Sequence, residues 1–430
     1  MSVLLTKNRL IKQTLIYTLS DGLCKAISFI TLPFISFYIV PKQLGICANF
    51  DVMMQVIMLL AGQVMIGVLP YVYYKKSKQE LATWISSLFS VIIIICIAFL
   101  IIIIFCSDAI EKYLQIGLLL QLLTIVSVIT HLITSIDTTL LRLEEKPFCF
   151  AFLQILQTII YIVLLIVLVI NLKLDAIGKI YSGVISFIVI SILHLSYLLK
   201  RGYLVRRVDK KVIKEILLFA LPLLPHSLSF WFKSGTDKIL ITNYCGLEAN
   251  GLFSMAMSFG AIYTIFNTAF SNAFIPYLQK RINSFTDKNI EREKINLVFL
   301  TYKLSIGFVF LYFFLLIICW YAIYYLLSDK YEPSFQFMPY ILLSLVFNSI
   351  YGLVIQYPYT IKKTVGIGLI TFSGSIVQFA LSYLLIKVYG MDGIKISIVI
   401  GSFIIMAGIW FYSNKVYPMP WITALKKLRI

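Results

Sequence analysis

The stretch FWFKSGTDKILI, residues 230–241, places three charged side chains in a run that is otherwise typical of a membrane helix. They are Lys233, Asp237 and Lys238. Each charge at the bilayer centre costs about 2.5–3.5 kcal/mol on insertion scales, and charges that persist there usually face a watery cavity and serve a function. Ammonium groups in such a cavity can bind an anion, and a carboxylate can carry a proton or a metal cation.

The helix that carries these charges is predicted to be polar along one face. His226, Ser229, Lys233 and Asp237 lie on one stripe at three- and four-residue spacing. Lys233 and Asp237 can therefore form an acid–base pair, whereas Lys238 lies about 100° further round the helix. The upstream prolines, at positions 222 and 225, favour a kink. A kinked, charged helix is costly in lipid but not beside a watery cavity.

Two further apolar segments carry polar stripes at the same spacing. In the first, Asp21 and Lys25 again form an i, i+4 acid–base pair. Several polar helices need a common place to face, and the simplest place is a central cavity between two lobes. The residues are Thr14, Tyr17, Asp21, Lys25 and Ser28 in the first segment, and Gln121, Thr124, His131, Ser135, Thr138 and Arg142, with Asp137 beside them, in the second.

Several of these residues also have a purely structural interpretation. Lys25 and Lys238 could extend to the interface or pair only for structure. Arg142 is as readily a cytoplasmic surface residue. His131 fits a packing role as well as a cavity role, and Asp21 fits either a cation carrier or the counter-ion of Lys25.

The composition predicts a polytopic membrane protein. Of the 430 residues, 60% are hydrophobic and 13% are charged, and the mean hydropathy is +0.93. A soluble domain is nearer half apolar and a quarter charged. Apolar runs long enough to span the bilayer recur about twelve times. The seven cysteines and three histidines show no paired spacing, so we expect no metal site, disulfide framework or cofactor.

The basic residues predict the orientation. With the N-terminus in the cytoplasm, cytoplasmic segments hold 26 of the 37 lysines and arginines, and the opposite side holds 5. This asymmetry favours an even number of spans with both termini cytoplasmic. The net charge of +18 is then mostly a topogenic signal, and nucleic acid is not an expected partner.

The chain is predicted to consist of two halves. Residues 1–200 form an N-terminal six-helix lobe, residues 201–214 a basic cytoplasmic linker, and residues 215–430 a C-terminal six-helix lobe. Weak repeats connect the halves: YIVPKQLG (38–45) matches YCGLEANG (244–251), and KLDAIGKI (173–180) matches YGMDGIKI (389–396). Halves of equal orientation are typical of secondary transporters that bind substrate between two lobes.

Motifs for enzymatic chemistry are absent from the sequence. It contains no HExxH, no GxSxG, no Walker loop and no dinucleotide-binding fingerprint. Uphill transport would therefore draw on an ion gradient rather than on ATP. We interpret the chain as a transporter and not as an enzyme.

The segments LPFISFYIVPKQLG, FALPLLPHSLSFWFKSGTDKILI, GLEANGLFSMA and YGMDGIKISIVIGS, with the basic start KNRLIKQTLIY, carry a family resemblance. The chain resembles an O-antigen or polysaccharide flippase of the multidrug/oligosaccharidyl-lipid/polysaccharide exporter superfamily. The resemblance covers nearly the whole chain at the level of span layout. It implies an all-α protein of about twelve transmembrane helices, with two six-helix lobes forming a V around a central cavity.

The resemblance also implies a function and a place. Such a flippase moves an oligosaccharide on undecaprenyl pyrophosphate from the cytoplasmic to the periplasmic face of the bacterial inner membrane, by alternating access. Coupling to protons or sodium and contacts with other surface-polysaccharide assembly proteins are further expectations. The cationic cavity would use Lys233, Lys238, Lys25 and Arg142, and coupling or charge pairing would use Asp237, Asp21 and Asp137. The polar lining of the cavity would include His131 and His226 together with five residues that could contact the sugars: Tyr17, Gln121, Thr124, Tyr351 and Gln356.

Three alternatives stay open at this point. A multidrug efflux antiporter of the same superfamily would favour an acidic cavity for its cationic substrates, whereas lysines predominate in and near these spans. A membrane-embedded polymerase or glycosyltransferase would be expected to show a sizeable outward loop or a carboxylate cluster. A scaffold for other envelope enzymes would not need charged stripes inside its helices.

Overall fold

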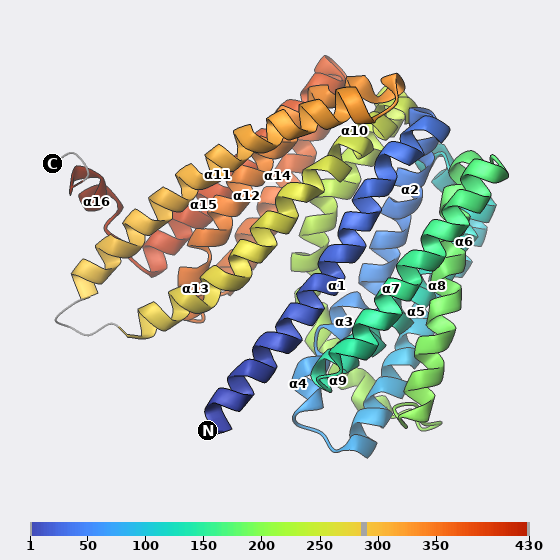
Figure 1. Cartoon of the computed structure of the whole chain (residues 1–430), viewed down its shortest axis with the longest axis horizontal. Coiled ribbons are helices and arrows are strands. Elements are labelled where there is room, and N and C mark those ends of the chain that lie inside the picture. Colours follow the sequence, from blue (N-terminus) through green and yellow to red (C-terminus); the bar gives the residue numbers. More distant parts are fainter. Residues whose placement is uncertain (1, 285–289, 428–430) are drawn as a thin grey trace. The chain divides into compact units, whose positions relative to one another are not determined.

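The computed structural model consists of α-helices joined by short connections (Figure 1). It describes residues 2–284 and 290–427, with side chains from 16 to 424 except at 25, 28, 230, 283 and 285–289. No strand occurs in this part of the chain. Twelve helices are long and apolar enough to cross a membrane, so the all-α prediction and the predicted number of spans are confirmed. The predicted V shape and the cytoplasmic placement of both termini stay predictions.

The helices divide between two compact units. Unit 1 comprises Met1–Trp231 and Gly246–Gly251, and unit 2 comprises Phe232–Cys245 and Leu252–Ile430. The division thus falls within α10 rather than at the basic segment 201–214, because α9 packs against α5 and α3 of unit 1. The lobe boundaries expected from the sequence stay a prediction. The helices of unit 1 are α1 (Ser2–Tyr38), α2 (Pro41–Met58), α3 (Val64–Ile66), α4 (Leu69–Tyr73), α5 (Lys78–Leu114), α6 (Leu118–Leu143), α7 (Pro147–Leu165), α8 (Asp175–Lys200) and α9 (Lys210–Ala220).

The second half of the chain begins with a long, interrupted helix. In α10 (Leu224–Asn283), Gly246 has φ 90° and breaks the helix into two. Glycine suits this position because a Cβ atom disfavours positive φ. A 3₁₀ turn at Leu221–Leu223 precedes α10, at the prolines that predicted a kink. The other helices are α11 (Ile290–Leu326), α12 (Met338–Val354), α13 (Gln356–Thr360), α14 (Val365–Tyr389), α15 (Met391–Val416) and α16 (Trp421–Lys427).

Local sequence signals set the ends of several helices. Ser77 caps α5: its hydroxyl accepts from the backbone N–H of Glu80, and the Glu80 carboxylate accepts from the backbone N–H of Ser77. This reciprocal capping box satisfies two donors that a helix start leaves open. Pro41 and Pro147 stand at the first positions of α2 and α7, where a missing N–H costs nothing.

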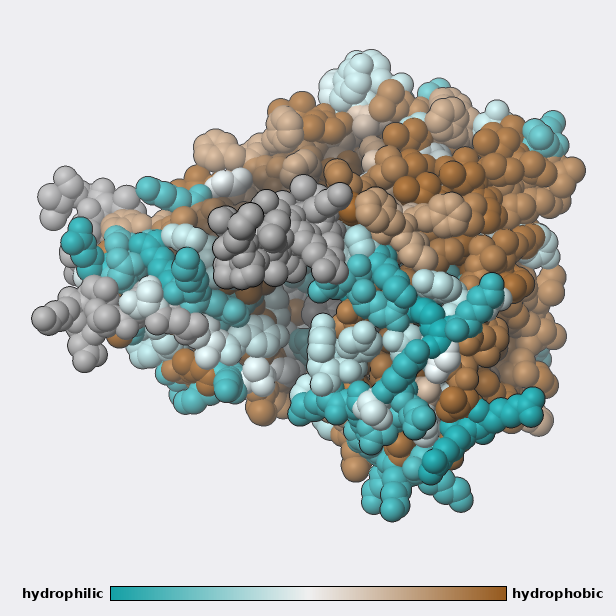
Figure 2. All heavy atoms as spheres, turned by 60° about the horizontal axis from the view of Figure 1, so that its bottom comes forward, coloured by the Kyte–Doolittle hydropathy of each residue, from teal (hydrophilic) through white to brown (hydrophobic). Residues whose placement is uncertain are grey.

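An extensive apolar core of unit 1 lies among α2, α5, α6 and α9. Trp84, Ile85 and Leu88 of α5 pack with Val128 and Leu132 of α6, and all five are at most 1% exposed. Figure 2 shows hydrophobic side chains mainly over the upper right of the view and hydrophilic ones mainly toward the bottom and the left. Because lipid is as apolar as leucine, such helices associate through close packing and polar contacts rather than through the hydrophobic effect.

The repeated glycines meet each other in unit 1. A Cβ added at Gly45 would overlap the carbonyl oxygen of Leu247, and one added at Gly251 would overlap the carbonyl oxygen of Pro41. Gly45 thus meets the residue four positions before Gly251, and Gly251 meets the residue four positions before Gly45. Two segments related by a local twofold axis make reciprocal contacts of this kind. Small residues allow backbones to approach this closely in membranes.

We expect Gly251→Ala to destabilise the protein by about 1–3 kcal/mol, because the added methyl group must displace the α2 backbone. Thermal unfolding in detergent measures this. Gly307→Ala on α11 is the matched control, since a Cβ there meets no atom within 4 Å. Equal melting temperatures for the two variants would contradict the proposed tight crossing.

Candidate functional site

Lys233 and Asp237, from the charged stretch 230–241, each form a hydrogen bond with an amide side chain of unit 2. Lys233 Nζ donates to Asn348 Oδ1 of α12 at 2.7 Å. Gln378 of α14 donates from Nε2 to Asp237 Oδ2 at 3.3 Å and to the Lys233 carbonyl oxygen at 3.2 Å. Helices α12 and α14 both contact α15, so their packing positions the two amides against α10.

The acid–base contact predicted between Lys233 and Asp237 is not formed within the described residues. Each side chain has a neutral partner instead. Asp237 is 2% exposed, and its Oδ1 has no hydrogen-bond partner in the part of the chain that the structure describes. The ammonium group of Lys233 thus bonds to a neutral amide oxygen rather than to a carboxylate among the described residues.

Two further predicted residues lie on the same helix. Lys238 is partly buried and has a polar or electrostatic contact of its own. His226 is also partly buried, and its carbonyl oxygen accepts from Ser229 Oγ. The predicted roles, of Lys238 as a cation in the cavity and of His226 in its polar lining, stay predictions.

Asp137 belongs to a buried charge cluster that joins α6 to the end of α8. His194 Nδ1 lies 2.6 Å from Asp137 Oδ2, and Arg201 pairs with Asp137 Oδ1. The side chains of Asp137, His194 and Arg201 are 0%, 1% and 10% exposed. Of the two predicted roles for Asp137, coupling or charge pairing, the structure shows a charge pair.

The cluster continues to the end of the helices through Glu144. Arg201 Nη1 donates to Glu144 Oε2 at 2.9 Å, Tyr203 Oη donates to Glu144 Oε1 at 2.5 Å, and Lys146 Nζ lies 2.7 Å from Oε2. Burial lowers the pKa of Arg201 to about 10, so its guanidinium stays charged at pH 7. The hydrogen bond to Glu144 raises the pKa of Lys146. Arg201 and Lys146 therefore both carry a positive charge where they contact Glu144.

A second polar feature of unit 1 is a pocket of about 250 Å³ among α2, α6, α7 and α8. His131 lines it, and its ring stacks on Phe187 at a centroid distance of 3.4 Å. Its predicted place in a central cavity between two lobes stays a prediction. The other polar walls come from Cys47, Asp51, Ser127, Tyr161 and Lys179.

Asp51 and Lys179 were not among the predicted site residues, although each charge stands alone in an apolar run. Lone charges in a predicted span are the signal that could have identified them. Lys179 also falls at the same place in KLDAIGKI as Lys395 in YGMDGIKI. Lys395 is 8% exposed, and its Nζ donates to Asp392 and Gln336.

Arg142, Asp21 and Tyr17 lie together between α1 and α7. Arg142 Nη2 is 3.7 Å from Asp21 Oδ2, and its guanidinium lies 4.6 Å from the centroid of the Phe150 ring. Tyr17 packs edge-on against the same ring at 5.2 Å. The Arg142 side chain is 52% exposed. The predicted partner of Asp21 was Lys25, whose side chain lies outside the described residues.

Four predicted sugar-contacting residues are engaged inside the helix bundles. Gln121 and Thr124 are 0% exposed and bond to backbone carbonyl oxygens of Ile116 and Gln121. Gln356 is 9% exposed and donates to the Gly352 carbonyl oxygen. Tyr351 packs against a small apolar cluster. Their observed contacts satisfy helical carbonyls or fill space, and their predicted roles in lining a polar cavity stay predictions.

The family model described as "Polysaccharide biosynthesis protein" matches residues 38–285, more than half of the chain. The chain belongs to this family. Among curated proteins, no sequence match is found. The resemblance expected from the sequence is thereby confirmed at the level of family. Within the part of the chain that the structure describes, no cluster of three or more histidine, cysteine or acidic residues could hold a metal ion.

Solved structures show which fold this member of the polysaccharide biosynthesis family adopts. A multidrug resistance MATE family transporter of the MOP superfamily, in an inward-facing conformation, is similar with a TM-score of 0.72 and 15% identity, over 94% of this chain and 95% of that chain. The lipid II flippase MurJ, in an inward closed conformation, is similar with a TM-score of 0.70 and 18% identity, over 96% and 89%. The chain therefore shares the fold of these two proteins, and its twelve long apolar helices are those of a multi-pass membrane protein.

Proposed function

We propose that this protein is a flippase that moves a lipid-linked oligosaccharide across the bacterial inner membrane. The substrate is an O-antigen repeat unit on undecaprenyl pyrophosphate, transferred from the cytoplasmic to the periplasmic face by alternating access. The observation that carries the proposal is the polysaccharide biosynthesis family match over residues 38–285. The similarity in fold to a lipid II flippase supports transport of a lipid-linked glycan rather than its synthesis.

Lys233 is the residue that we propose for contact with the pyrophosphate. Its ammonium group is held by a neutral amide oxygen and not by a carboxylate among the described residues. An anionic headgroup crossing the membrane loses hydration, and a charge-assisted hydrogen bond from a positioned ammonium group offsets part of that loss. A cationic contact of this kind disfavours the cationic drugs that a multidrug antiporter would carry.

Cation coupling is the second part of the proposal. Asp237 is buried one helical turn from Lys233, and one of its oxygens is unbonded among the described residues. A carboxylate in this position can take up a proton or a sodium ion and thereby change the net charge beside Lys233. Asp21, at the α1–α7 boundary, is more accessible and is the second candidate.

Cells that lack the protein provide the test. We expect lipid-linked oligosaccharide to accumulate with its glycan on the cytoplasmic face, protected in spheroplasts from an added lectin or glycosidase. Restoring the gene should restore glycan display and the assembly of surface polysaccharide by partner proteins. Normal display together with new sensitivity to cationic dyes would instead indicate drug efflux, and accumulation of unpolymerised units on the outer face would indicate a polymerase.

A further inference from the structure

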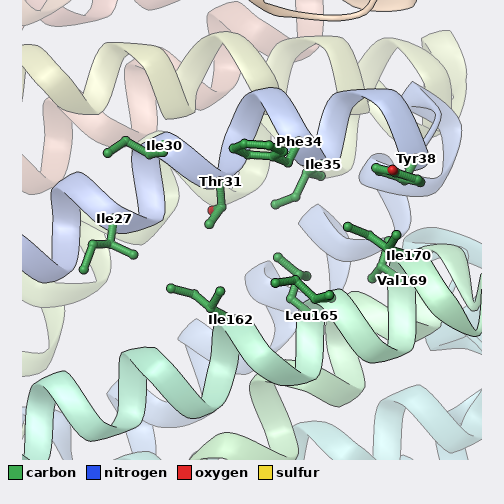
Figure 3. Close-up of a pocket in the computed structure, with 11 residues that line it drawn as sticks. Ile27, Ile30, Thr31, Phe34, Ile35, Tyr38, Ile162, Leu165, Val169 and Ile170 are labelled. Atoms are coloured by element: carbon green, nitrogen blue, oxygen red, sulfur yellow. The ribbon is translucent and has the colours of Figure 1, made fainter.

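An apolar groove runs between α1 and α7 inside unit 1. It has a volume of about 380 Å³ and is lined by the second half of α1 and by the end of α7 with the π-helical turn Ile166–Asn171. In Figure 3, Ile27, Thr31 and Ile35 of α1 point toward Ile162 and Leu165 of α7 across the groove. All of these residues lie in membrane-spanning segments, so the groove is open to hydrocarbon chains.

The same two helices hold an arginine beyond one end of the groove. Arg142 contacts Asp21 of α1 and the Phe150 ring of α7. Both contacts lie on the N-terminal side of the groove residues, so α1 and α7 run in the same direction. We call the line between these two helices, from Arg142 to the far end of the groove, the seam. At about 1.5 Å of rise per residue, Asp21 lies about 9 Å along α1 from the first groove residue, Ile27. The predicted orientation places this charged end of the seam at the cytoplasmic face.

The arginine has capacity left for a ligand. Its ion pair with Asp21, at 3.7 Å, is long compared with the 2.7–2.9 Å of strong charge-assisted hydrogen bonds. Half of its side chain is exposed. The planar guanidinium fork can bind a phosphate through two hydrogen bonds. The seam thus combines an anion-binding group with an apolar channel in one line.

We propose that this seam binds the carrier lipid of the substrate, with a phosphate at Arg142 and the first part of the polyisoprenoid chain in the groove. The inference rests on the proposed function, because that function supplies a polyprenyl phosphate as the ligand. Apolar chains gain no hydrophobic energy by moving from lipid into an apolar groove. The charged end must therefore provide the affinity, and the groove selects by shape.

The walls of the groove favour a branched chain. Six isoleucines and one valine line it, and the π-helical turn makes one wall irregular. Ile30 and Phe34 are 60% and 59% exposed, so the groove is open along one side and a chain can enter from the membrane without passing through the protein. Lateral entry is what a lipid-linked substrate requires, since its tail stays in the bilayer.

Photo-crosslinking of the full chain in phosphatidylcholine vesicles tests the proposal. Benzoylphenylalanine is placed at Thr31 or at Ile166, on opposite walls of the groove, and the probe is radiolabelled undecaprenyl phosphate. Ile159 on α7 is the matched control position, because it is 50% exposed and lies outside the groove. We expect labelling at both groove positions to exceed that at Ile159 by at least about fivefold, equivalent to about 1 kcal/mol.

Two further measurements test whether Arg142 binds the phosphate and whether the ligand is a polyprenyl phosphate rather than an ordinary anionic phospholipid. Arg142→Gln should reduce groove labelling by about tenfold, since it removes the charged donor. Unlabelled undecaprenyl phosphate should compete, and an equal amount of phosphatidylglycerol should not. Equal competition by phosphatidylglycerol, or equal labelling at Ile159, would overturn the proposal.

Failure of this inference is separable from failure of the proposed function. A protein that translocates lipid-linked oligosaccharide in vesicles but gives no selective groove labelling would refute the seam and leave the flippase assignment intact. Selective groove labelling in a protein that translocates no glycan would support the seam and refute the flippase assignment.

Discussion

Lys233→Asp is expected to reduce transport by at least about 100-fold, which corresponds to the loss of about 3 kcal/mol of interaction with the anionic headgroup. The substitution removes the ammonium group that Asn348 positions. It also places a second carboxylate one turn from Asp237, so that the site repels a pyrophosphate. Membrane insertion should persist, because both side chains carry one charge and the span stays equally apolar.

Glycan display on the cell surface measures the transport, and the amount of protein in the membrane fraction measures insertion. Lys233→Arg separates charge from position: the charge persists, but the guanidinium group does not fit an ammonium position. Lys303→Asp on α11 is the matched control, since Lys303 is an exposed lysine on another helix. Normal glycan display in Lys233→Asp would exclude Lys233 from the substrate path.

Asp137→Ala should be among the most destabilising single substitutions in the chain. Removing one partner of a buried ion pair costs about 3–5 kcal/mol, because the remaining charge stays buried with less compensation. Here that charge is the guanidinium of Arg201, 10% exposed, which retains the Glu144 carboxylate as an anionic partner. We expect the melting temperature in detergent to fall by roughly 5–10 °C.

Two variants test the cause of this loss. In Asp137→Leu combined with Arg201→Met, both charges are gone, and part of the stability should return. Glu215→Ala is the control, because Glu215 is 53% exposed in its pair with Lys76 and an exposed pair contributes at most about 1 kcal/mol. An unchanged melting temperature for Asp137→Ala would show that the cluster does not hold α6 to α8.

Helical periodicity predicted which side chains share a face but not what that face contacts. Lys233 and Asp237 do lie one turn apart, yet their partners are Asn348 and Gln378, which are more than 100 residues away in the chain. The predicted stripe on α6 likewise divides between two environments. His131 lines a polar pocket, whereas Asp137 is part of an ion cluster. A helical wheel contains no information on which neighbour packs at each height.

The glycine repeats were more informative than the charges. YIVPKQLG and YCGLEANG were matched on sequence alone, and the structure brings Gly45 and Gly251 into reciprocal backbone contact. Backbones can approach this closely only where no side chain intervenes. The repeated glycine therefore indicated where two helices cross. A lysine in a span indicates only that some polar partner must exist.

The sequence by itself determined that this is an all-helical membrane protein with twelve spans, because apolar length and the cost of buried backbone polar groups leave no other fold. It also determined where charges enter the membrane region. Only the tertiary structure decided what each charge contacts: Asp137 pairs with Arg201, Lys233 bonds to a neutral amide, and Arg142 forms a long ion pair beside an apolar groove. Those outcomes depend on helix packing, which close-fitting side chains and small residues set between segments far apart in the chain.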